Sequence, residues 1–281
     1  MAGMVEKRGF GLWLTHLGLI LGVAVIAFPI WLAFIASTVS QPEIVRPPMP
    51  LLPGDRFLEN YRDALYSGVN VPVARMLFNS FVMAMGIALG KIAISLLSAF
   101  AIVYFRFPGR LVFFWLIFLT LMLPVEVRIV PTYEVAARFG MLNSYPGLIF
   151  PLIASATATF LFRQFFLTVP DELAEAARVD GARPMRFFVD ILLPMSRTNI
   201  AALFVILFIY GWNQYLWPLL ITTEPEMNTI VMGIKRMADV ADAIPQWNVV
   251  MATVMLAMLP PVAVVILMQR LFVKGLVETE K

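Results

Sequence analysis

A glycine-rich stretch that ends in lysine is the first segment of this chain that could carry chemistry. Residues 86–92 read GIALGKI, and Gly86, Gly90 and Lys91 resemble part of a loop that cradles nucleotide phosphates. That loop needs four residues between its glycines and a Ser or Thr after its lysine to hold magnesium. Here three residues separate the glycines, and Ile92 follows the lysine. The sequence therefore predicts no nucleotide site, so energy from ATP has to come from a partner.

Catalytic and metal-binding side chains are scarce. The chain has no cysteine and one histidine, which excludes disulfides and cysteine-ligated zinc or iron–sulfur clusters. No serine, carboxylate pair or metal cluster has a spacing that supports hydrolysis, so a membrane-embedded enzyme is a weak alternative. We expect no catalytic residue, metal, cofactor or nucleic acid on this chain. The two glycines are typical of helices that approach each other closely in a membrane.

Lys91 lies near the middle of an apolar run, where a charged side chain costs about 2.5 to 3.5 kcal/mol. Two interpretations are open. The lysine either faces a polar path for an anionic substrate, or it pairs with a carboxylate or with helix-end carbonyls on a neighbouring helix. The second arrangement is the more common one for charges inside a membrane.

Polar side chains interrupt two other apolar stretches. Asn213 and Gln214 lie deep in one of them, where amides either join helices by hydrogen bonds or line a substrate cavity. Glu126, Arg128 and Glu134 follow a proline and form either an interfacial ion-pair network around a re-entrant turn or a gate. The two amides and the intramembrane lysine are our candidates for a substrate pathway.

The composition is that of an all-α polytopic membrane protein. Hydrophobic residues make up 60% of the chain, charged residues make up 14%, and the mean hydropathy is +0.85. We expect one transmembrane domain over residues 1–281. Apolar runs predict six transmembrane helices, at about 17–35, 81–103, 111–125, 145–162, 200–221 and 249–268.

The basic residues predict the orientation in the membrane. Twelve Lys and Arg lie at the two termini, in the turn after the second span, and in or next to the loop 168–196, where Arg163 and Arg197 flank it; eight lie in the opposite loops. By the positive-inside rule both termini and the loop 168–196 are cytoplasmic. The proline-rich loop 37–75 and the loop 222–247 are then on the outer side.

The cytoplasmic loop is a charged island with a helix–turn–helix pattern. Residues 168–194 read TVPDELAEAARVDGARPMRFFVDILLP. Gly181 is suited to end the first helix, and Pro184 is suited to start the second. The second helix has an apolar face of Phe187, Phe188, Ile191 and Leu192, and a charged face of Arg183, Arg186 and Asp190. Such an amphipathic helix has to lie on a surface.

This loop also carries a recognisable motif. Residues 175–181 read EAARVDG, nine residues follow, and residues 191–194 read ILLP. The pattern resembles the cytoplasmic signature loop of permease subunits of bacterial binding-protein-dependent ABC importers. The resemblance implies contact with an ATPase for the motif residues and the amphipathic helix, namely Glu175, Ala176, Ala177, Gly181, Arg183, Arg186, Phe187, Phe188, Ile191, Leu193 and Pro194. The two phenylalanines are expected to plug into a cleft of that ATPase as a buried aromatic anchor.

The resemblance extends over essentially the whole chain. Six spans with cytoplasmic termini agree with the type I importer architecture and with the smaller permease of the carbohydrate-uptake branch. Within that branch the chain is similar to permeases for sn-glycerol-3-phosphate, and the similarity weakens in the outer loops, at about 41–75 and 223–246. The similar blocks are SFVMAMGIALGKIAISLLSAFAIVYFRFP, LMLPVEVRIVPTYEV, ASATATFLFRQFF and FIYGWNQYLWPLL.

The resemblance implies a multi-pass subunit of the bacterial inner membrane that works by alternating access. Its implied partners are a second permease in a heterodimer, two copies of a cytoplasmic ATPase that uses ATP and Mg, an extracytoplasmic binding protein and the lipid bilayer. The expected substrate is sn-glycerol-3-phosphate or a related glycerophosphodiester. The alternatives are the same machinery importing a sugar or oligosaccharide, a secondary transporter driven by an ion gradient, and a membrane scaffold.

Overall fold

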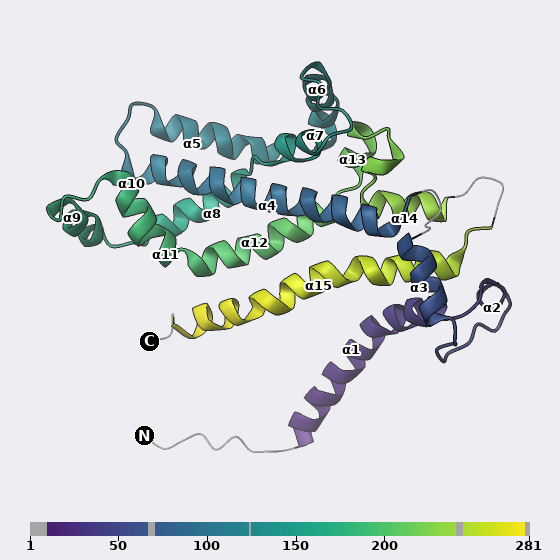
Figure 1. Ribbon diagram of the computed structural model, residues 1–281. Helices are drawn as coiled ribbons and strands as arrows, with labels where there is room; N and C mark the ends of the chain where they lie inside the picture. The colour runs from purple at the N-terminus through teal and green to yellow at the C-terminus, as the bar shows by residue number, and fades with distance from the viewer. Residues whose placement is uncertain (1–9, 67–70, 124, 240–243, 279–281) are drawn as a thin grey trace. The chain divides into compact units, whose positions relative to one another are not determined.

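The computed structural model describes residues 10–66, 71–123, 125–239 and 244–278 (Figure 1). Within these ranges the chain is helical, with loops and turns but no β-strand. It forms two compact units, each described here by itself. Unit 1 comprises Met1–Pro72 and Arg236–Leu256, and unit 2 comprises Val73–Lys235 and Ala257–Lys281.

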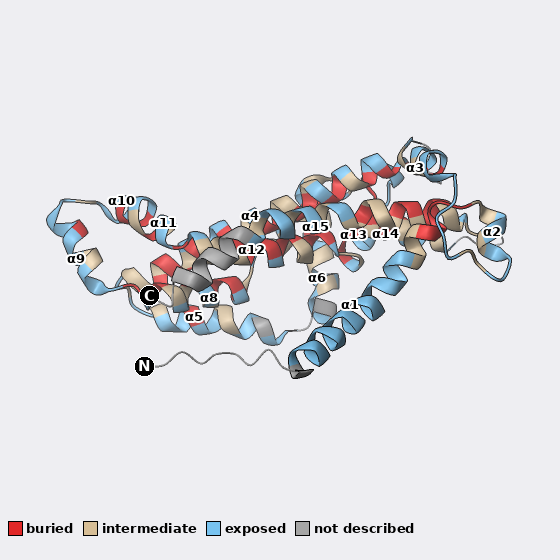
Figure 2. Ribbon diagram, turned by 90° about the horizontal axis from the view of Figure 1, so that it is seen from below, coloured by how far each residue is buried: buried red, intermediate tan, exposed pale blue. Residues whose placement is uncertain are grey.

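Unit 1 contains a long apolar helix and two short ones. Helix α1 is Phe10–Ala36, α2 is Gln41–Val45 and α3 is Phe57–Tyr66. Most of α1 is exposed within the chain (Figure 2), as expected of a helix that lipid surrounds. The buried Asn60 organises the loop after α1, because its amide nitrogen donates to the carbonyl oxygens of Ser37 and Val39, both at 2.9 Å. Asn60 in turn accepts a hydrogen bond from Asn248.

Unit 2 is built around α4, Val73–Tyr104, whose two neighbours are α8, Ala156–Phe166, and α12, Arg197–Trp212. The glycines of the GIALGKI stretch allow a close approach, as their spacing predicts. A Cβ atom at Gly86 would lie 2.6 Å from the side chain of Ile149, and one at Gly90 would lie 2.6 Å from that of Ile153. These glycines pack helices and hold no phosphate.

The remaining elements place the functional regions. Helix α5 is Arg110–Leu119, and a 3₁₀ turn follows at Thr120–Met122. Shorter helices form the two ends of unit 2: α6 is Val125–Arg138, α7 is Tyr145–Ile149, α9 is Asp171–Val179, α10 is Pro184–Phe187, α11 is Leu193–Met195, α13 is Leu216–Ile221 and α14 is Ile230–Ala238. The last helix, α15, is Trp247–Glu278.

The described helices include three that are long and apolar enough to cross a membrane, at Leu12–Ala36, Val73–Tyr104 and Trp247–Gln269. They correspond to the predicted first, second and sixth spans. Two bent helix pairs raise the number to five if each pair is one span. The count of six spans stays a prediction. So does the orientation, which rests partly on terminal residues outside the described ranges.

Three predicted spans differ from the structure in detail. The span predicted at 111–125 is helical only as α5 and the 3₁₀ turn, and α5 has 10 residues. The span predicted at 145–162 is a pair, Tyr145–Leu152 and Ala156–Phe166, bent by 50°. The span predicted at 200–221 is interrupted at 213–215, between α12 and α13. Hydropathy averages over such breaks, because a short polar or proline-containing turn changes the mean little.

Candidate functional site

The turn of the signature loop, residues 168–196, has the geometry that its sequence predicts. Gly181 has φ +71°. Its N–H donates to the carbonyl of Arg178, and the N–H of Ala182 donates to the carbonyl of Ala177, which together form a Schellman cap at the end of α9. A Cβ atom at Gly181 would meet nothing within 4 Å. The glycine is therefore required by backbone conformation and not by lack of space.

The second half of the loop is one helical run with a widened turn. Helix α10 starts at Pro184 as expected, continues as a π-helix at Phe188–Leu192 and ends as α11. The run meets α12 at an angle of 74°. Its charged face carries an ion pair between Arg186 Nε and Asp190 Oδ2 at 3.2 Å, and both side chains are exposed.

The expected aromatic anchor faces the inside of the chain. Phe187 and Phe188 are each only 6% exposed. The ring of Phe188 lies 4.9 Å from that of Phe100, and the ring of Phe187 lies 5.3 Å from that of Tyr104, measured between centroids. Tyr104 also contacts Phe166. We call these five side chains the aromatic layer.

The aromatic layer corrects one part of the sequence interpretation. The amphipathic helix needs a surface for its apolar face, and α4 provides it within the same chain. In this structure Phe187 and Phe188 are therefore unavailable to a cleft on another protein. Hydrophobic periodicity identified the apolar face of the helix correctly, but it does not distinguish a surface of the same chain from that of a partner.

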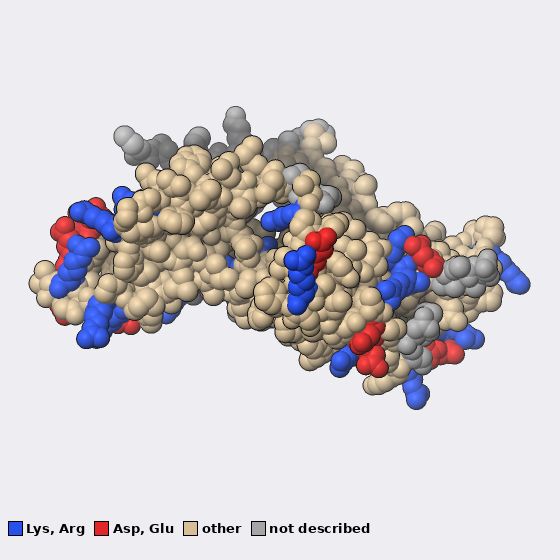
Figure 3. Space-filling view, turned by 90° about the horizontal axis from the view of Figure 1, so that it is seen from above, with Lys and Arg blue, Asp and Glu red and all other residues tan. Residues whose placement is uncertain are grey.

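The exposed face of the loop is charged with a few large apolar side chains. Figure 3 shows basic and acidic side chains gathered at the end of unit 2 that carries α9 and α10, whereas the surface over α5 carries almost none. Among the other predicted contact residues, Ala177 is buried and Ile191 and Leu193 are half-buried. The residues presented outward include Glu175, Ala176, Val179, Arg183, Met185, Arg186, Val189 and Pro194.

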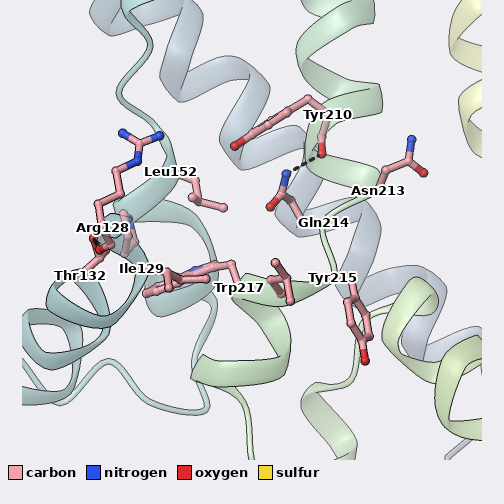
Figure 4. A pocket seen from close by; sticks show the side chains of 11 residues that line it. Arg128, Ile129, Thr132, Leu152, Tyr210, Asn213, Gln214, Tyr215 and Trp217 are labelled. Carbon is pink, nitrogen blue, oxygen red and sulfur yellow. Dashed lines mark hydrogen bonds between the residues drawn. The ribbon is translucent and has the colours of Figure 1, made fainter. Parts of the chain in front are cut away.

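A cavity of about 330 Å³ lies elsewhere in unit 2, beside α6, α13 and the end of α12 (Figure 4). Both predicted amides, Asn213 and Gln214, line it. They do so because α12 ends at Trp212 and α13 begins at Leu216, which leaves an unwound segment between them. Arg128 forms part of the wall across from these amides. We call this space the Arg128 cavity.

Hydrogen bonds hold the unwound segment in place. Gln214 Nε2 donates to the carbonyl of Tyr210 at 3.1 Å (Figure 4), so this amide bonds to its own helix. Trp217 Nε1 donates to the carbonyl of Gly147 at 3.0 Å, which ties α13 to α7. The structure thus places the two amides on a cavity wall, and their part in a substrate pathway stays a prediction.

Lys91 is 7% exposed, and its Nζ lies 3.9 Å from the centroid of the Tyr210 ring. Tyr210 itself lines the Arg128 cavity. Among the described side chains, no carboxylate lies within 4.0 Å of Lys91. The common arrangement, a pair with a carboxylate, is therefore absent from the described part of the chain, and a cation–π contact takes its place.

Arg128 is the cavity residue that the sequence interpretation did not choose. The sequence interpretation grouped it with Glu126 and Glu134, either as an ion-pair network or as a gate. The side chain of Glu126 lies outside the described residues, and Glu134 forms no ion pair with Arg128. The available signal was a basic side chain close to two prolines in an apolar stretch, which is a costly position for a charge without a function.

A cluster that could hold a metal would need several ligands in one place. The described residues contain no group of three or more His, Cys, Asp or Glu side chains that converge.

Comparison with known families now decides what kind of protein this is. Residues 91–278 match the family described as "Binding-protein-dependent transport system inner membrane component". The chain belongs to this family. As predicted, it is a permease of an ABC importer, a multi-pass inner membrane transport component and not an enzyme.

Curated relatives match this permease from end to end. The sn-glycerol-3-phosphate transport system permease protein UgpE of Brucella melitensis is 63% identical over 282 residues, covering 99% of this chain and all of the relative. The protein of the same description from Rhizobium meliloti is also 63% identical with the same coverage. The one from Escherichia coli O1:K1 is 59% identical over 281 residues.

A solved structure shares the fold of the permease. It comes from a bacterial ABC transporter involved in the import of the acidic polysaccharide alginate. The similarity covers 96% of this chain and 99% of the other with a TM-score of 0.82, at 20% sequence identity. The predicted permease fold is confirmed at that level.

Proposed function

We propose that this permease carries sn-glycerol-3-phosphate, or a related glycerophosphodiester, across the inner membrane by alternating access. The observation that carries this proposal is the 63% identity, over the full chain, to permeases described by sn-glycerol-3-phosphate transport. The 59% identity to a relative from a different bacterial genus, with the same description, supports the same substrate.

The proposed assembly pairs this chain with a second permease. Two copies of a cytoplasmic ATPase supply energy from ATP and Mg, and an extracytoplasmic binding protein delivers the substrate. In this assembly the chain crosses the membrane six times as one permease domain, with cytoplasmic termini. The loop 168–196 faces the ATPase, and the outer loops 37–75 and 222–247 face the binding protein.

Coupling then uses the two faces of the signature loop differently. Its exposed face, including Glu175, Arg183 and Arg186, docks on the ATPase, while its buried face transmits movement through the aromatic layer. That layer is packed on α4, so a push on the loop moves α4 directly. Lys91 lies on the same helix, nine residues or about 14 Å from Phe100. One rigid helix can therefore link the docking surface to the cavity region.

The proposed substrate path runs past Lys91, Asn213 and Gln214. Support comes from the cavity that the two amides line and from the contact of Lys91 with its wall. The unwound segment between α12 and α13 supports the same assignment, because irregular backbone at membrane depth is tolerated where it lines a cavity.

Uptake by a defined transporter tests the function. This chain would be expressed with a partner permease, an ATPase and a binding protein of the same transport system, in cells that lack their own uptake of the tested compounds. We expect uptake of radiolabelled sn-glycerol-3-phosphate that requires all four components. If the cells take up a disaccharide but no sn-glycerol-3-phosphate, the sugar alternative is correct. Uptake by this chain alone, driven by an ion gradient, would instead identify a secondary transporter.

A further inference from the structure

The Arg128 cavity has an unusual charge balance for a space inside a membrane protein. Among the described residues that line it, Arg128 is the one charged residue, and none is Asp or Glu. Arg128 also forms no ion pair with any side chain that the structure describes. The described charge that borders the cavity is therefore positive, and such a charge attracts an anion.

A second positive charge lies directly behind the wall. The Lys91 ammonium group sits on the ring face of Tyr210, and the same tyrosine faces the cavity. Tyr210 thus lies between Lys91, which it contacts, and the cavity that it lines together with Arg128. Two like charges that border one cavity repel each other, and a group of opposite charge bound between them offsets that repulsion.

The rest of the wall suits a small polar molecule. Figure 4 shows Arg128 on one side and Asn213 and Gln214 on the other. Arginine binds phosphate oxygens through a planar fork of N–H donors, and amides can donate to further oxygens or to hydroxyls. The volume of about 330 Å³ is at the lower end of the range for small-molecule sites.

We propose that the Arg128 cavity is a phosphate-binding station on the transport path, with Arg128 as the residue that binds the phosphate group of the substrate. Lys91 acts from behind Tyr210 as a buried charge that strengthens the field, and the amides face the glycerol end. This inference rests on the proposed function and names the residues that select an anionic substrate. A neutral sugar would leave both cations without a partner, so the site disfavours it.

The experiment uses the complete transporter in liposomes of phosphatidylcholine, with binding protein and sn-glycerol-3-phosphate at saturating concentrations. Uptake and ATP hydrolysis are measured together for Arg128→Gln, Arg128→Lys and Lys91→Gln. Arg138→Gln is the matched control, because Arg138 is exposed on the same helix and does not line the cavity. Saturation by the binding protein ensures that the readout is translocation and not delivery.

We expect Arg128→Gln to lower the uptake per ATP hydrolysed by about tenfold, as for the loss of a charge-assisted hydrogen bond. Arg128→Lys should recover most of this loss, and Lys91→Gln should cause a smaller one. Stimulated ATP hydrolysis should persist in every variant, which shows that each assembly is intact. Arg138→Gln should behave as the unmodified protein.

Three other results are possible, and each has one meaning. If the unmodified transporter takes up no sn-glycerol-3-phosphate, the proposed function is wrong. If it does, and Arg128→Gln transports equally well, the function stands and the phosphate station is wrong. The third result comes from repeating the measurements in liposomes that also contain phosphatidylglycerol, because the phosphate of a lipid headgroup could bind Arg128 as the phosphate of the substrate does. A defect seen only in those liposomes would assign the cavity to a lipid headgroup and overturn the substrate site.

Discussion

The two ends of unit 2 use charge in opposite ways. The signature loop carries many charged side chains, which are exposed and partly paired with one another, as Arg186 is with Asp190. The Arg128 cavity has a single charged residue among its described lining residues, and the buried Lys91 contacts Tyr210 of the same lining. Water stabilises the first set at little cost, whereas the buried Lys91 is expensive to keep. The comparison teaches that a few poorly compensated charges indicate a site better than many solvated ones do.

The apolar groups reverse this contrast. At the loop end, Phe187 and Phe188 are buried on α4 and hold the loop to the helix that it has to move. At the cavity end, the backbone opens between α12 and α13 to expose polar groups. At the loop end, buried aromatic side chains thus fix a solvated charged loop to α4. At the cavity end, a polar unwound segment interrupts an apolar pair of helices.

The largest expected effect on stability comes from disrupting the aromatic layer that packs the loop on α4. Phe188→Asp removes a buried ring and places a carboxylate among aromatic side chains, so we expect a loss of at least about 3 kcal/mol of stability. Thermal unfolding of the purified assembly would show it. Val189→Asp is the control. Val189 is 50% exposed, so the assembly with this variant should unfold at nearly the normal temperature. Normal thermal stability in Phe188→Asp together with a released ATPase would instead mean that the ring docks on the partner.

The turn between the two loop helices should be the next most sensitive position. Gly181→Val forces a β-branched residue to adopt a positive φ, which costs about 1 to 3 kcal/mol and shifts the angle between the helices. We expect an inserted permease that hydrolyses ATP without uptake. Gly181→Asn should retain most uptake, since asparagine tolerates this conformation and nothing lies within 4 Å of the new Cβ. Equal uptake by both variants would contradict the conformational argument.

A hydrogen-bond network at the cavity end provides a purely structural comparison. The fully buried Asn79 donates from Nδ2 to the carbonyls of Glu226 and Asn228 and accepts from the hydroxyl of Tyr145. Asn79→Ala leaves these groups without their partner and should cost about 1 to 3 kcal/mol in thermal unfolding. Ser95→Ala removes one hydrogen bond of 3.3 Å and should cost less. The reverse order would show that the network does not hold this end together.

The smallest effect on stability is expected at the exposed ion pair. Arg186→Gln breaks the contact with Asp190, and pairs of this kind contribute about 0.3 to 0.5 kcal/mol. The unfolding temperature should hardly change. A large drop in ATPase co-purification with unchanged stability would therefore report docking and support the proposed contact face. Unchanged co-purification would remove Arg186 from that face.

The loop illustrates how far sequence reasoning reaches. The Gly181 turn and the restart at Pro184 follow from local rules, because a positive φ and a proline at the first helical position depend on few neighbours. The apolar face of the second helix is equally local, since it depends only on helical periodicity. What that face touches is not local. It depends on α4 lying within reach, which no spacing inside the loop encodes.

The cavity illustrates the opposite limit. Asn213, Gln214 and Lys91 were recognisable as polar groups in apolar runs, but each had two acceptable roles. Arg128 was visible but was grouped with Glu126 and Glu134, as an ion-pair network or a gate, and was not chosen as a pathway residue. Residues 128, 210 and 213 come together only when α6 and α12 are placed around one space. Hydropathy also predicted continuous spans at 145–162 and 200–221, because it does not detect the breaks in these helices.

By itself the sequence determined that this is an all-helical membrane protein, that its loop 168–196 carries the permease motif, and that Gly181 shapes that loop. These properties follow from composition and short-range pattern, which each residue carries with it. Only the tertiary structure decided that Phe187 and Phe188 pack on α4 and that Arg128 shares a cavity with the two amides. Burial and convergence are properties of pairs far apart in the chain, and they exist only once the helices have packed.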